Sequence, residues 1–319
     1  MRIVVMGCGR WGAFLASYAK GLGHEVMLYG RASSRDFMEL KQSRENEYMR
    51  IPEGIALTCE LEEAMAFGQM ALVAIGAQSL REFSRSIAAL DTRDKDFVLC
   101  MKGLENVTGK RLSQVFTEET GLSNRTAVWV GPGHVQDFAR GIPNCMVVSS
   151  YHVEITRKIV REMTSNLIRF YYSKDIIGVE TGAAAKNVIG IAAGMLDGLG
   201  YSCLKGALMA RGAREISRLV QAMGGEEITV YGLSHLGDYE ATLFSSYSRN
   251  RQFGEDLALG KGFHHLAEGV ETASGLCILS ERHGVELPIS RSVHEIIHNR
   301  KDPKKALVDL FLRPIKYEF

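Results

Sequence analysis

The sequence predicts two domains of different class: an α/β domain with a doubly wound, mostly parallel sheet, followed by an all-α domain. Short apolar segments alternate with amphipathic helical segments up to about residue 175, which is typical of a parallel sheet covered by helices. From about residue 178 the apolar residues follow helical spacing. Because 319 residues are enough for two domains, we expect them at residues 1–177 and 178–319.

Apolar runs place the elements of both domains. Strands are expected at residues 3–6, 25–29, 70–75, 97–101, 127–130, 145–149 and 168–172. Helices between them include residues 80–90, 109–119 and 153–165. The second domain is expected to contain helices at residues 179–196, 205–223, 254–259, 270–283, 290–299 and 303–312.

The first expected strand runs directly into a glycine-rich turn. Gly7, Gly9 and Gly12 have the G-x-G-x-x-G spacing, and an apolar helical pattern follows. In a dinucleotide-binding Rossmann turn these glycines permit the tight turn, the approach of the pyrophosphate and the packing of the helix on the strand. The pyrophosphate then lies at the positive helix end, here beside Arg10 and Trp11. An ordinary tight turn is the alternative, and the flanking strand and helix favour the nucleotide site.

The end of the second expected strand bears on the choice of nucleotide. A fold that prefers NAD usually carries Asp or Glu about 20 residues after the glycines, where it binds the ribose 2′-hydroxyl. Here the sequence is Gly30-Arg-Ala-Ser-Ser-Arg35. Arg31 and Arg35 offer donors for a 2′-phosphate. We therefore expect NADP(H) to be preferred and NAD(H) to be possible; a solvated loop with two surface arginines is the alternative.

Composition excludes several classes of partner. Lys and Arg total 38 against 37 Asp and Glu, so no basic surplus indicates nucleic acid. Six scattered cysteines lack metal-ligand spacing, and we expect reduced, mostly buried thiols and no metal.

The immediate start of a strand argues against a signal peptide, and charged residues interrupt the apolar stretch 182–200, so we expect no membrane insertion and a cytoplasmic location. His134, His264 and His265 are expected to be structural or surface residues.

A helical segment of small and apolar residues carries the first candidate for catalysis. At helical spacing Gly182, Lys186, Gly190 and Asp197 share one face, which lets a ligand approach closely. Burial in an apolar setting favours the neutral form of a lysine, which suits proton transfer or carbonyl polarisation. The alternative is a structural lysine that reaches a carboxylate.

A polar segment provides the second candidate. Asp238, Thr242, Arg249 and Asn250 lie within a short span rich in hydroxyl groups. Arg, Asn and Thr side chains bind phosphate esters or carboxylates. The alternative is a polar loop with a helix cap.

The ends of two expected strands provide the third candidate. Lys102 follows one strand, and Gly131 and His134 follow another within Gly-Pro-Gly-His. In parallel sheets the carboxyl ends of strands face the ligand crevice. A lysine at a strand end is also compatible with simple solvation.

Together these segments resemble the NAD(P)-dependent sn-glycerol-3-phosphate dehydrogenases of the bacterial type. The resemblance covers nearly the whole chain, in the order GCGRWG at 7–12, KGLE at 102–105, GPGH at 131–134, AAAKNVIGIAAGMLDGLG at 183–200, LGD at 236–238, SRNRQFG at 248–254 and AEGVETA at 267–273. It implies a Rossmann domain followed by a helical domain, and a homodimer. It also implies reversible hydride transfer between the nicotinamide and C2 of dihydroxyacetone phosphate, giving sn-glycerol 3-phosphate for phospholipid synthesis.

The resemblance also implies residue roles. Lys186 would polarise or protonate the C2 oxygen, Asp238 would hold that ammonium, and Lys102 would be a second cation near the substrate. The implied substrate-binding residues are Asn187, Thr242, Gly131, His134, Arg249 and Asn250, the last two at the phosphate. The implied cofactor-binding residues are Gly7, Gly9, Arg10, Trp11, Gly12, Arg31, Arg35, Lys102, Arg249 and Glu268.

The sequence departs from the family pattern in three places. Gly133 stands where Ser or Thr is usual, Cys203 lies near an expected Asn in a segment apparently one residue shorter, and Arg10 adds a cation to the phosphate loop. The departures at Gly133 and Cys203 leave open a diverged paralogue that reduces another small phosphorylated or carboxylated ketone. A nucleotide sensor without activity is a further alternative, which the intact Lys186 and Asp238 disfavour.

Overall fold

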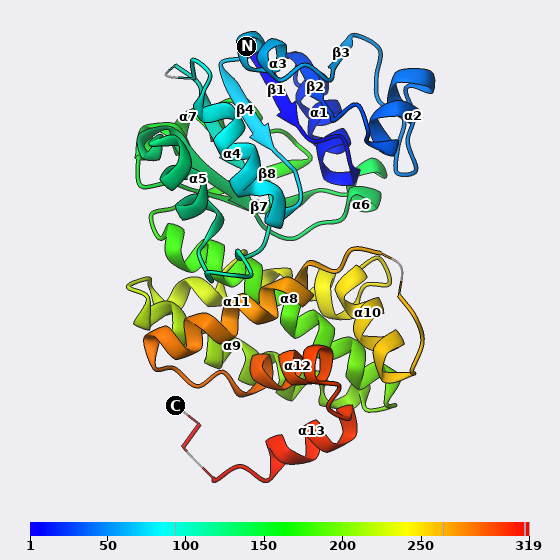
Figure 1. Cartoon of the computed structure of the whole chain (residues 1–319), viewed down its shortest axis with the longest axis vertical. Helices are drawn as coiled ribbons and strands as arrows, with labels where there is room; N and C mark the ends of the chain where they lie inside the picture. The colour runs from blue at the N-terminus through cyan, green and yellow to red at the C-terminus, as the bar shows by residue number, and fades with distance from the viewer. Residues whose placement is uncertain (93, 264, 316, 319) are drawn as a thin grey trace. The chain divides into compact units, whose positions relative to one another are not determined.

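The chain folds into two compact units. The structure, a computed structural model, describes residues 1–92, 94–263, 265–315 and 317–318. The first unit comprises Met1–Lys102 and Arg111–Ile176, and the second comprises Gly103–Lys110 and Ile177–Phe319 (Figure 1). The predicted boundary between residues 177 and 178 assigns the segment Gly103–Lys110 to the first domain, whereas the structure assigns it to the second unit. This segment joins the helical unit because Leu104 belongs to its apolar core.

The first unit is built on an eight-stranded sheet with the order β3-β2-β1-β4-β5-β6-β7-β8. All neighbouring strands are parallel except β6 and β7. The strands are β1 (Arg2–Met6), β2 (Glu25–Tyr29), β3 (Ile55–Thr58), β4 (Met70–Val73), β5 (Asp96–Leu99), β6 (Thr126–Val130), β7 (Asn144–Ser149) and β8 (Ile168–Ser173). The predicted fold class is confirmed, and the seven expected strands are present. Sequence analysis missed β3, a four-residue edge strand that is only half buried.

Helices cover both faces of this sheet, so alternate strand residues enter different cores. Ile3 and Val5 pack in one cluster with residues of α1, α2 and α7, whereas Phe97 packs against Phe116 of α5 at a ring separation of 4.9 Å on the other face. Figure 1 shows α4 and α5 side by side on that face. The helices are α1 (Arg10–Gly21), α2 (Arg35–Ser43), α3 (Leu61–Phe67), α4 (Leu80–Ala88), α5 (Leu112–Thr120), α6 (Val135–Ala139) and α7 (Val153–Met163).

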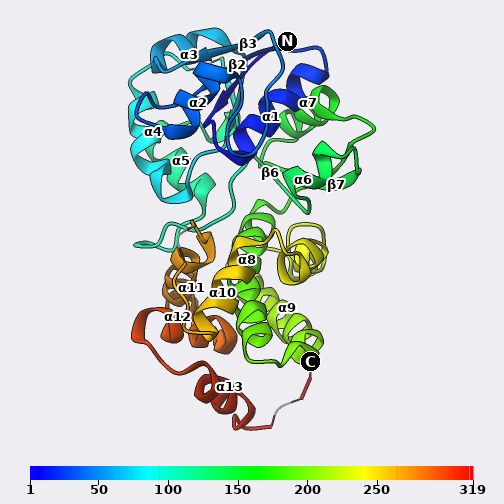
Figure 2. The same ribbon diagram turned by 90° about the vertical axis from the view of Figure 1, so that its right-hand side faces the viewer.

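The elements of the second unit, in its described residues, are helices and short helical turns joined by loops. The unit contains α8 (Ile176–Gly198), α9 (Lys205–Ala222), α10 (Arg249–Ala258), α11 (Glu268–His283), α12 (Pro288–Asn299) and α13 (Pro303–Phe311), and the short turns η3 (Ser202–Leu204), η4 (Glu227–Tyr231), η5 (Leu236–Asp238) and η6 (Glu240–Phe244). Figure 2 shows α9, α10 and α11 around α8. By length and composition α8 is a candidate membrane span, but 89 % of its most apolar window is buried inside the protein. We therefore interpret it as the core helix of this unit.

A stripe of glycines lets other segments lie directly on α8. Glycine occupies positions 182, 190, 194 and 198, at intervals of four or eight residues, and Lys186 lies on the same stripe. A Cβ atom at Gly194 would lie 1.9 Å from the backbone oxygen of Arg251, and one at Gly190 would lie 2.7 Å from Cγ2 of Thr242. Because these glycines have no side chains, η6 and α10 contact the backbone of α8 around Lys186.

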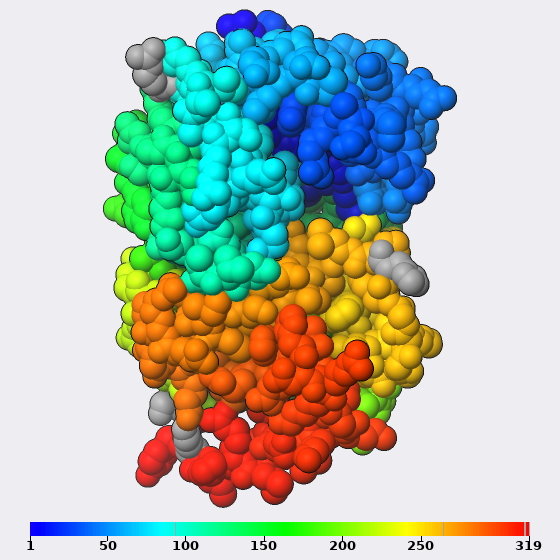
Figure 3. Space-filling model, viewed as in Figure 1, coloured from blue at the N-terminus to red at the C-terminus, as the bar shows by residue number. Residues whose placement is uncertain are grey.

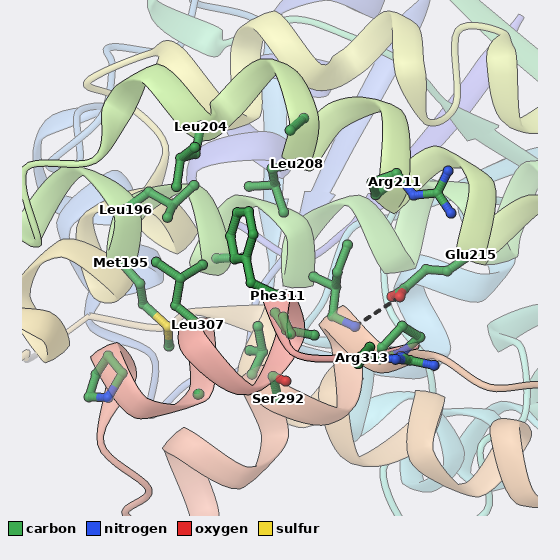
Figure 4. A pocket seen from close by; sticks show the side chains of 18 of the residues that line it. Met195, Leu196, Leu204, Leu208, Arg211, Glu215, Ser292, Leu307, Phe311 and Arg313 are labelled. Atoms are coloured by element: carbon green, nitrogen blue, oxygen red, sulfur yellow. Dashed lines mark hydrogen bonds between the residues drawn. The ribbon is translucent and has the colours of Figure 1, made fainter. Parts of the chain in front are cut away.

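A second contact region joins α8 and α9 to the last two helices. Buried Glu215 of α9 accepts hydrogen bonds from the amides of Ile289 and Ser290, at 2.9 and 3.0 Å, and so caps the start of α12 (Figure 4). A cavity of about 600 Å³ lies beside it, with Arg211 and Arg313 among its lining residues. Figure 3 shows α13, coloured red, on the surface of this unit.

Candidate active site

The glycine turn after β1 is formed by backbone geometry. Gly7 has φ +111°, and a Cβ atom there would lie 2.4 Å from the oxygen of Ala74. A Cβ atom at Gly12 would lie 1.8 Å from the oxygen of Gly7. Gly9 is the N-cap residue of α1, and a Cβ atom there would lie 3.6 Å from Oδ2 of Asp36, an ordinary contact distance. The turn therefore exposes the first amides of α1, which have no partner within the helix, to an incoming anion.

The residues predicted to choose the nucleotide lie at the end of β2 and the start of α2. The Arg35 side chain is 80 % exposed and pairs with Glu39 at 2.7 Å, and Arg31 is also exposed. Sequence analysis missed Asp36, whose Oδ2 lies 3.6 Å from the Cβ position of Gly9. It directly follows Arg35 and lies in the first turn of α2. A carboxylate at this place repels a phosphate that the arginines would attract.

Arg10 and Trp11 begin α1 directly after the turn. The Arg10 guanidinium lies 5.0 Å from the centre of the Tyr48 ring, a cation–π contact. Trp11 stacks on Phe14 at 5.1 Å and packs against Phe138 at 6.3 Å. Its ring thus contributes to the packing of α1 against α6.

Lys102 is joined to the Gly-Pro-Gly-His loop within the first unit. Its Nζ donates a hydrogen bond of 2.7 Å to the backbone oxygen of Gly131, and His134 is the N-cap residue of α6. Gly133 has φ +134°, and a Cβ atom there would lie 2.6 Å from the ring of Phe138. A serine or threonine would be strained in this conformation. The departure from the family pattern at this position therefore has a local cause.

The helical unit contains a buried Lys186–Asp238–Thr242 cluster, which we call the lysine centre. Lys186 is 6 % exposed, Asp238 1 % and Thr242 3 %. The Nζ atom of Lys186 lies 3.0 Å from Oδ2 of Asp238 and 2.5 Å from Oγ1 of Thr242. A buried ammonium needs such partners to remain charged. An ammonium held in this way can stabilise negative charge that develops on a substrate oxygen.

Three helices bring further predicted residues together beside this centre. Oδ1 of Asn250, near the start of α10, accepts a 2.9 Å hydrogen bond from the amide of Gly269, the residue after Glu268 in α11. A Cβ atom at Gly269 would lie 2.8 Å from the backbone oxygen of Asn187 in α8. Arg249 is the first residue of α10 and is half-buried. The middle of α8 and the N-termini of α10 and α11 thus converge.

The shortened segment 201–205 is part of a structural ion network. Lys205 Nζ donates to Asp197 at 2.7 Å and to the backbone oxygen of Leu243 at 2.8 Å. Ser202 and Arg251 also bond to Asp197. Burial raises the pKa of Asp197, but these hydrogen bonds outweigh it and lower the pKa overall. Cys203 is exposed, and its neighbours Ser202 and Lys205 are bonded to Asp197.

The other expectations concern cysteines, histidines and metals. The expectation of mostly buried thiols is wrong, since only Cys8 and Cys100 are buried and Cys203 is exposed. His264 lies outside the described residues, and His265 is exposed. In the described part of the chain, no three His, Cys, Asp or Glu side chains gather to hold a metal ion. Sequence analysis assigned no role to His235 and Tyr239, which pack behind the lysine centre.

Known proteins show where this architecture occurs. A family model described as the NAD-dependent glycerol-3-phosphate dehydrogenase N-terminus matches residues 2–156, and the model of the C-terminus matches residues 175–308. The chain is 35 % identical to a glycerol-3-phosphate dehydrogenase (NAD(P)+) of Pelodictyon phaeoclathratiforme, over 100 % of this chain and 99 % of that protein. It is 34 % identical to one of a Thermoanaerobacter species, with the same coverage. The crystal structure of glycerol-3-phosphate dehydrogenase from Coxiella burnetii aligns with a TM-score of 0.92 at 28 % identity, covering 98 % of this chain and 99 % of that one.

Proposed function

The chain belongs to the NAD-dependent glycerol-3-phosphate dehydrogenase family, and on that basis we propose how its residues perform the reaction. The enzyme reversibly reduces dihydroxyacetone phosphate at C2 with NAD(P)H, giving sn-glycerol 3-phosphate. Residues 1–177 serve as the cofactor domain, and residues 178–319 serve as the substrate and catalytic domain. The buried Lys186–Asp238 pair is the observation that carries this assignment of roles.

Lys186 acts on the C2 oxygen. A reduced nicotinamide, when bound, would supply a hydride, which is two electrons and one proton, to C2. Negative charge develops on the C2 oxygen, and the Lys186 ammonium stabilises it and donates the proton that forms the hydroxyl group. Asp238 and Thr242 keep the ammonium in place, at 3.0 and 2.5 Å. Lys102 supplies a second positive charge to the substrate.

The start of α10 binds the phosphate of the substrate. Arg249 and Asn250 are its first two residues, and helix N-termini favour anions. A phosphate held there supplies binding energy remote from C2 and fixes the geometry of the reacting carbonyl. The remaining substrate contacts come from Asn187, Thr242, Gly131 and His134.

The glycine turn binds the pyrophosphate of the cofactor, and NADP(H) is preferred. The cofactor residues are Gly7, Gly9, Arg10, Trp11, Gly12, Arg31, Arg35, Lys102, Arg249 and Glu268. Arg31 and Arg35 attract the 2′-phosphate. Arg35 would give up its ion pair with Glu39 to bind this phosphate. Asp36 opposes this attraction, so the preference is modest and NAD(H) is also used.

Three wider assignments complete the proposal. The product supplies backbones for phospholipid synthesis, the enzyme is cytoplasmic, and it acts as a homodimer. Light scattering during size-exclusion chromatography measures the molecular mass and so tests the dimer. A mass of about 35 kDa, that of one chain, would exclude it.

The experiment for the reaction follows the absorbance of the reduced nicotinamide. Purified protein is mixed with dihydroxyacetone phosphate and either NADPH or NADH. Rapid loss of absorbance with both, faster with NADPH, is the expected result. Faster loss with NADH would reject the preference and keep the enzyme. No loss with either cofactor in a protein that binds nucleotide would contradict the assigned reaction.

A further inference from the structure

A histidine and a tyrosine form a fully buried pair beside the lysine centre. His235 is the N-cap residue of η5, and Tyr239 follows Asp238 directly; both are 0 % exposed. The Nδ1 atom of His235 lies 2.7 Å from the backbone oxygen of Gly182, and its Nε2 atom lies 2.6 Å from the hydroxyl of Tyr239. A buried hydroxyl or imidazole without a hydrogen-bond partner would destabilise the folded protein, so these two hydrogen bonds contribute to its stability.

The direction of each hydrogen bond follows from its partners. A carbonyl oxygen only accepts, so Nδ1 of His235 carries the hydrogen and donates to Gly182. Burial lowers the pKa of His235 to about 4, and the imidazole is neutral at pH 7. Its Nε2 atom therefore accepts, and the Tyr239 hydroxyl donates to it. Burial raises the pKa of Tyr239 well above its usual value, which keeps this donor protonated.

These two hydrogen bonds connect the turn of α8 that carries Lys186 to the residues on either side of Asp238 in the sequence. Gly182 lies one helical turn before Lys186, and in an α-helix its carbonyl is the acceptor for the amide of Lys186. On the other side, His235 and Tyr239 flank Asp238 in the sequence. The missing side chain of Gly182 leaves room for this contact, since a Cβ atom there would lie 3.1 Å from Cβ of His235, closer than an ordinary carbon contact.

We propose that His235 and Tyr239 are positioning residues, which hold the segment carrying Asp238 against the turn of α8 that carries Lys186. This inference rests on the proposed roles of Lys186 and Asp238. The side chain of Tyr239 packs among Ile189, Leu243 and Ile289, so its ring is fixed by apolar contacts and its hydroxyl by His235. The result is a neutral tether between η5 and α8, independent of the ion pair itself.

The electrostatic surroundings explain why the tether is neutral. Lys186 and Asp238 face His235, and Glu215 and Tyr231 act on Tyr239. A protonated imidazole at this place would repel the Lys186 ammonium and compete with it for Asp238. A neutral imidazole makes both hydrogen bonds and leaves the carboxylate to the lysine.

Four variants separate positioning from plain stability. His235→Leu and Tyr239→Phe each remove one partner of the hydrogen bond between the two side chains. The double variant removes both partners, so that neither polar group remains buried without the other. His235→Asn is the conservative control, because its amide can donate where Nδ1 does. Each is measured for Tm, for kcat and KM with dihydroxyacetone phosphate and NADPH, and for the pH dependence of kcat.

We expect kcat to fall about 10- to 100-fold in His235→Leu and Tyr239→Phe, with KM for NADPH unchanged, because misplacement of a catalytic group has effects of this size. The alkaline fall of kcat should move to lower pH, since an ammonium without its carboxylate deprotonates more easily. The double variant should regain Tm without regaining kcat, and His235→Asn should retain more activity than His235→Leu.

Two results would overturn the inference. In the first, the single variants lose Tm but keep the parent kcat and pH profile at a temperature where they are folded. In the second, kcat in the double variant recovers together with Tm. Lys186→Met, measured in parallel, distinguishes failure of the positioning inference from failure of the proposed role of Lys186. If it is inactive while the His235 and Tyr239 variants are fully active, positioning fails and the role of Lys186 stands; if it is fully active, both fail.

Discussion

The glycine turn after β1 and the lysine centre in the helical unit are built by opposite means. The turn is local, spans six residues and depends on side chains that are missing, as the positive φ of Gly7 and the contact at Gly12 show. The lysine centre is non-local: Lys186 and Thr242 are 56 residues apart in the sequence and meet in a buried site. A local backbone motif can be recognised from its spacing and its flanking strand and helix, whereas a buried side-chain cluster depends on tertiary packing.

The largest effect is expected from filling the glycine turn. Gly12→Val places a Cβ atom 1.8 Å from the oxygen of Gly7, so the turn cannot close and the helix must shift. We expect nucleotide binding to be lost, with a fall in Tm, because overpacking and backbone strain both act. Titration with NADPH, followed by its fluorescence, measures the binding.

Gly206→Val provides the matched control for this prediction, because no heavy atom lies within 4 Å of a Cβ at that glycine of α9. It should bind NADPH like the parent. Equal NADPH binding by Gly12→Val would show that the turn is not the nucleotide site.

The buried histidine beside the lysine centre predicts an acid-dependent stability, whereas residues 7–12 of the glycine turn include no histidine or carboxylate. His235 has a folded pKa of about 4 against an ordinary 6.5, so the unfolded chain takes up this proton first as the pH falls. The free energy of unfolding should therefore decrease between pH 6.5 and 4, by about 3 kcal/mol from this group. Above pH 6.5 the group contributes no pH dependence.

Urea unfolding of the parent and of His235→Asn across pH 4–7.5 measures this contribution. The difference in unfolding free energy between the two should change with pH, because the variant has no proton to bind at this position. A constant difference would mean that His235 is not neutral and buried as described.

The smallest effect is expected at the choice of nucleotide, where Arg35 is exposed and Asp36 is half-buried, so solvent screens both charges. Arg35→Ala should lower the ratio of kcat/KM for NADPH to that for NADH by a few-fold, and Asp36→Asn should raise it by a similar factor. Steady-state kinetics with both cofactors measure the ratio. Movement of the two variants in the same direction would contradict the proposed opposition of Arg35 and Asp36.

Much of the fold was predictable from the sequence because parallel strands buried on both faces are continuous apolar runs. The short edge strand β3 lacks that signal. Helix α10 begins at Arg249, five residues before the predicted start, because Ser248 caps it and its first turn is polar. Apolar periodicity does not register such a turn.

The candidate site was predictable to different depths. The glycine turn followed from spacing, and the pairing of Lys186 with Asp238 followed from the family resemblance; the 3.0 Å contact between them agrees with it. The tether of His235 and Tyr239 was not predictable, because it depends on the close approach of η5 to α8 at Gly182. Asp36 was missed because its approach to Gly9 depends on how α2 lies beside the turn.

The most direct test compares two buried lysines of the helical unit, Lys186 and Lys205. Each is paired with an aspartate, Lys186 with Asp238 and Lys205 with Asp197, but only Lys186 is assigned to the reaction. Lys186→Met and Lys205→Met are compared for kcat with dihydroxyacetone phosphate and NADPH, and for NADPH binding. We predict that Lys186→Met loses about 1,000-fold or more in kcat and binds NADPH normally, whereas Lys205→Met loses Tm and retains most of its kcat. Equal losses of kcat in the two variants, or an active Lys186→Met, would contradict the assignment of the lysine centre as the catalytic site.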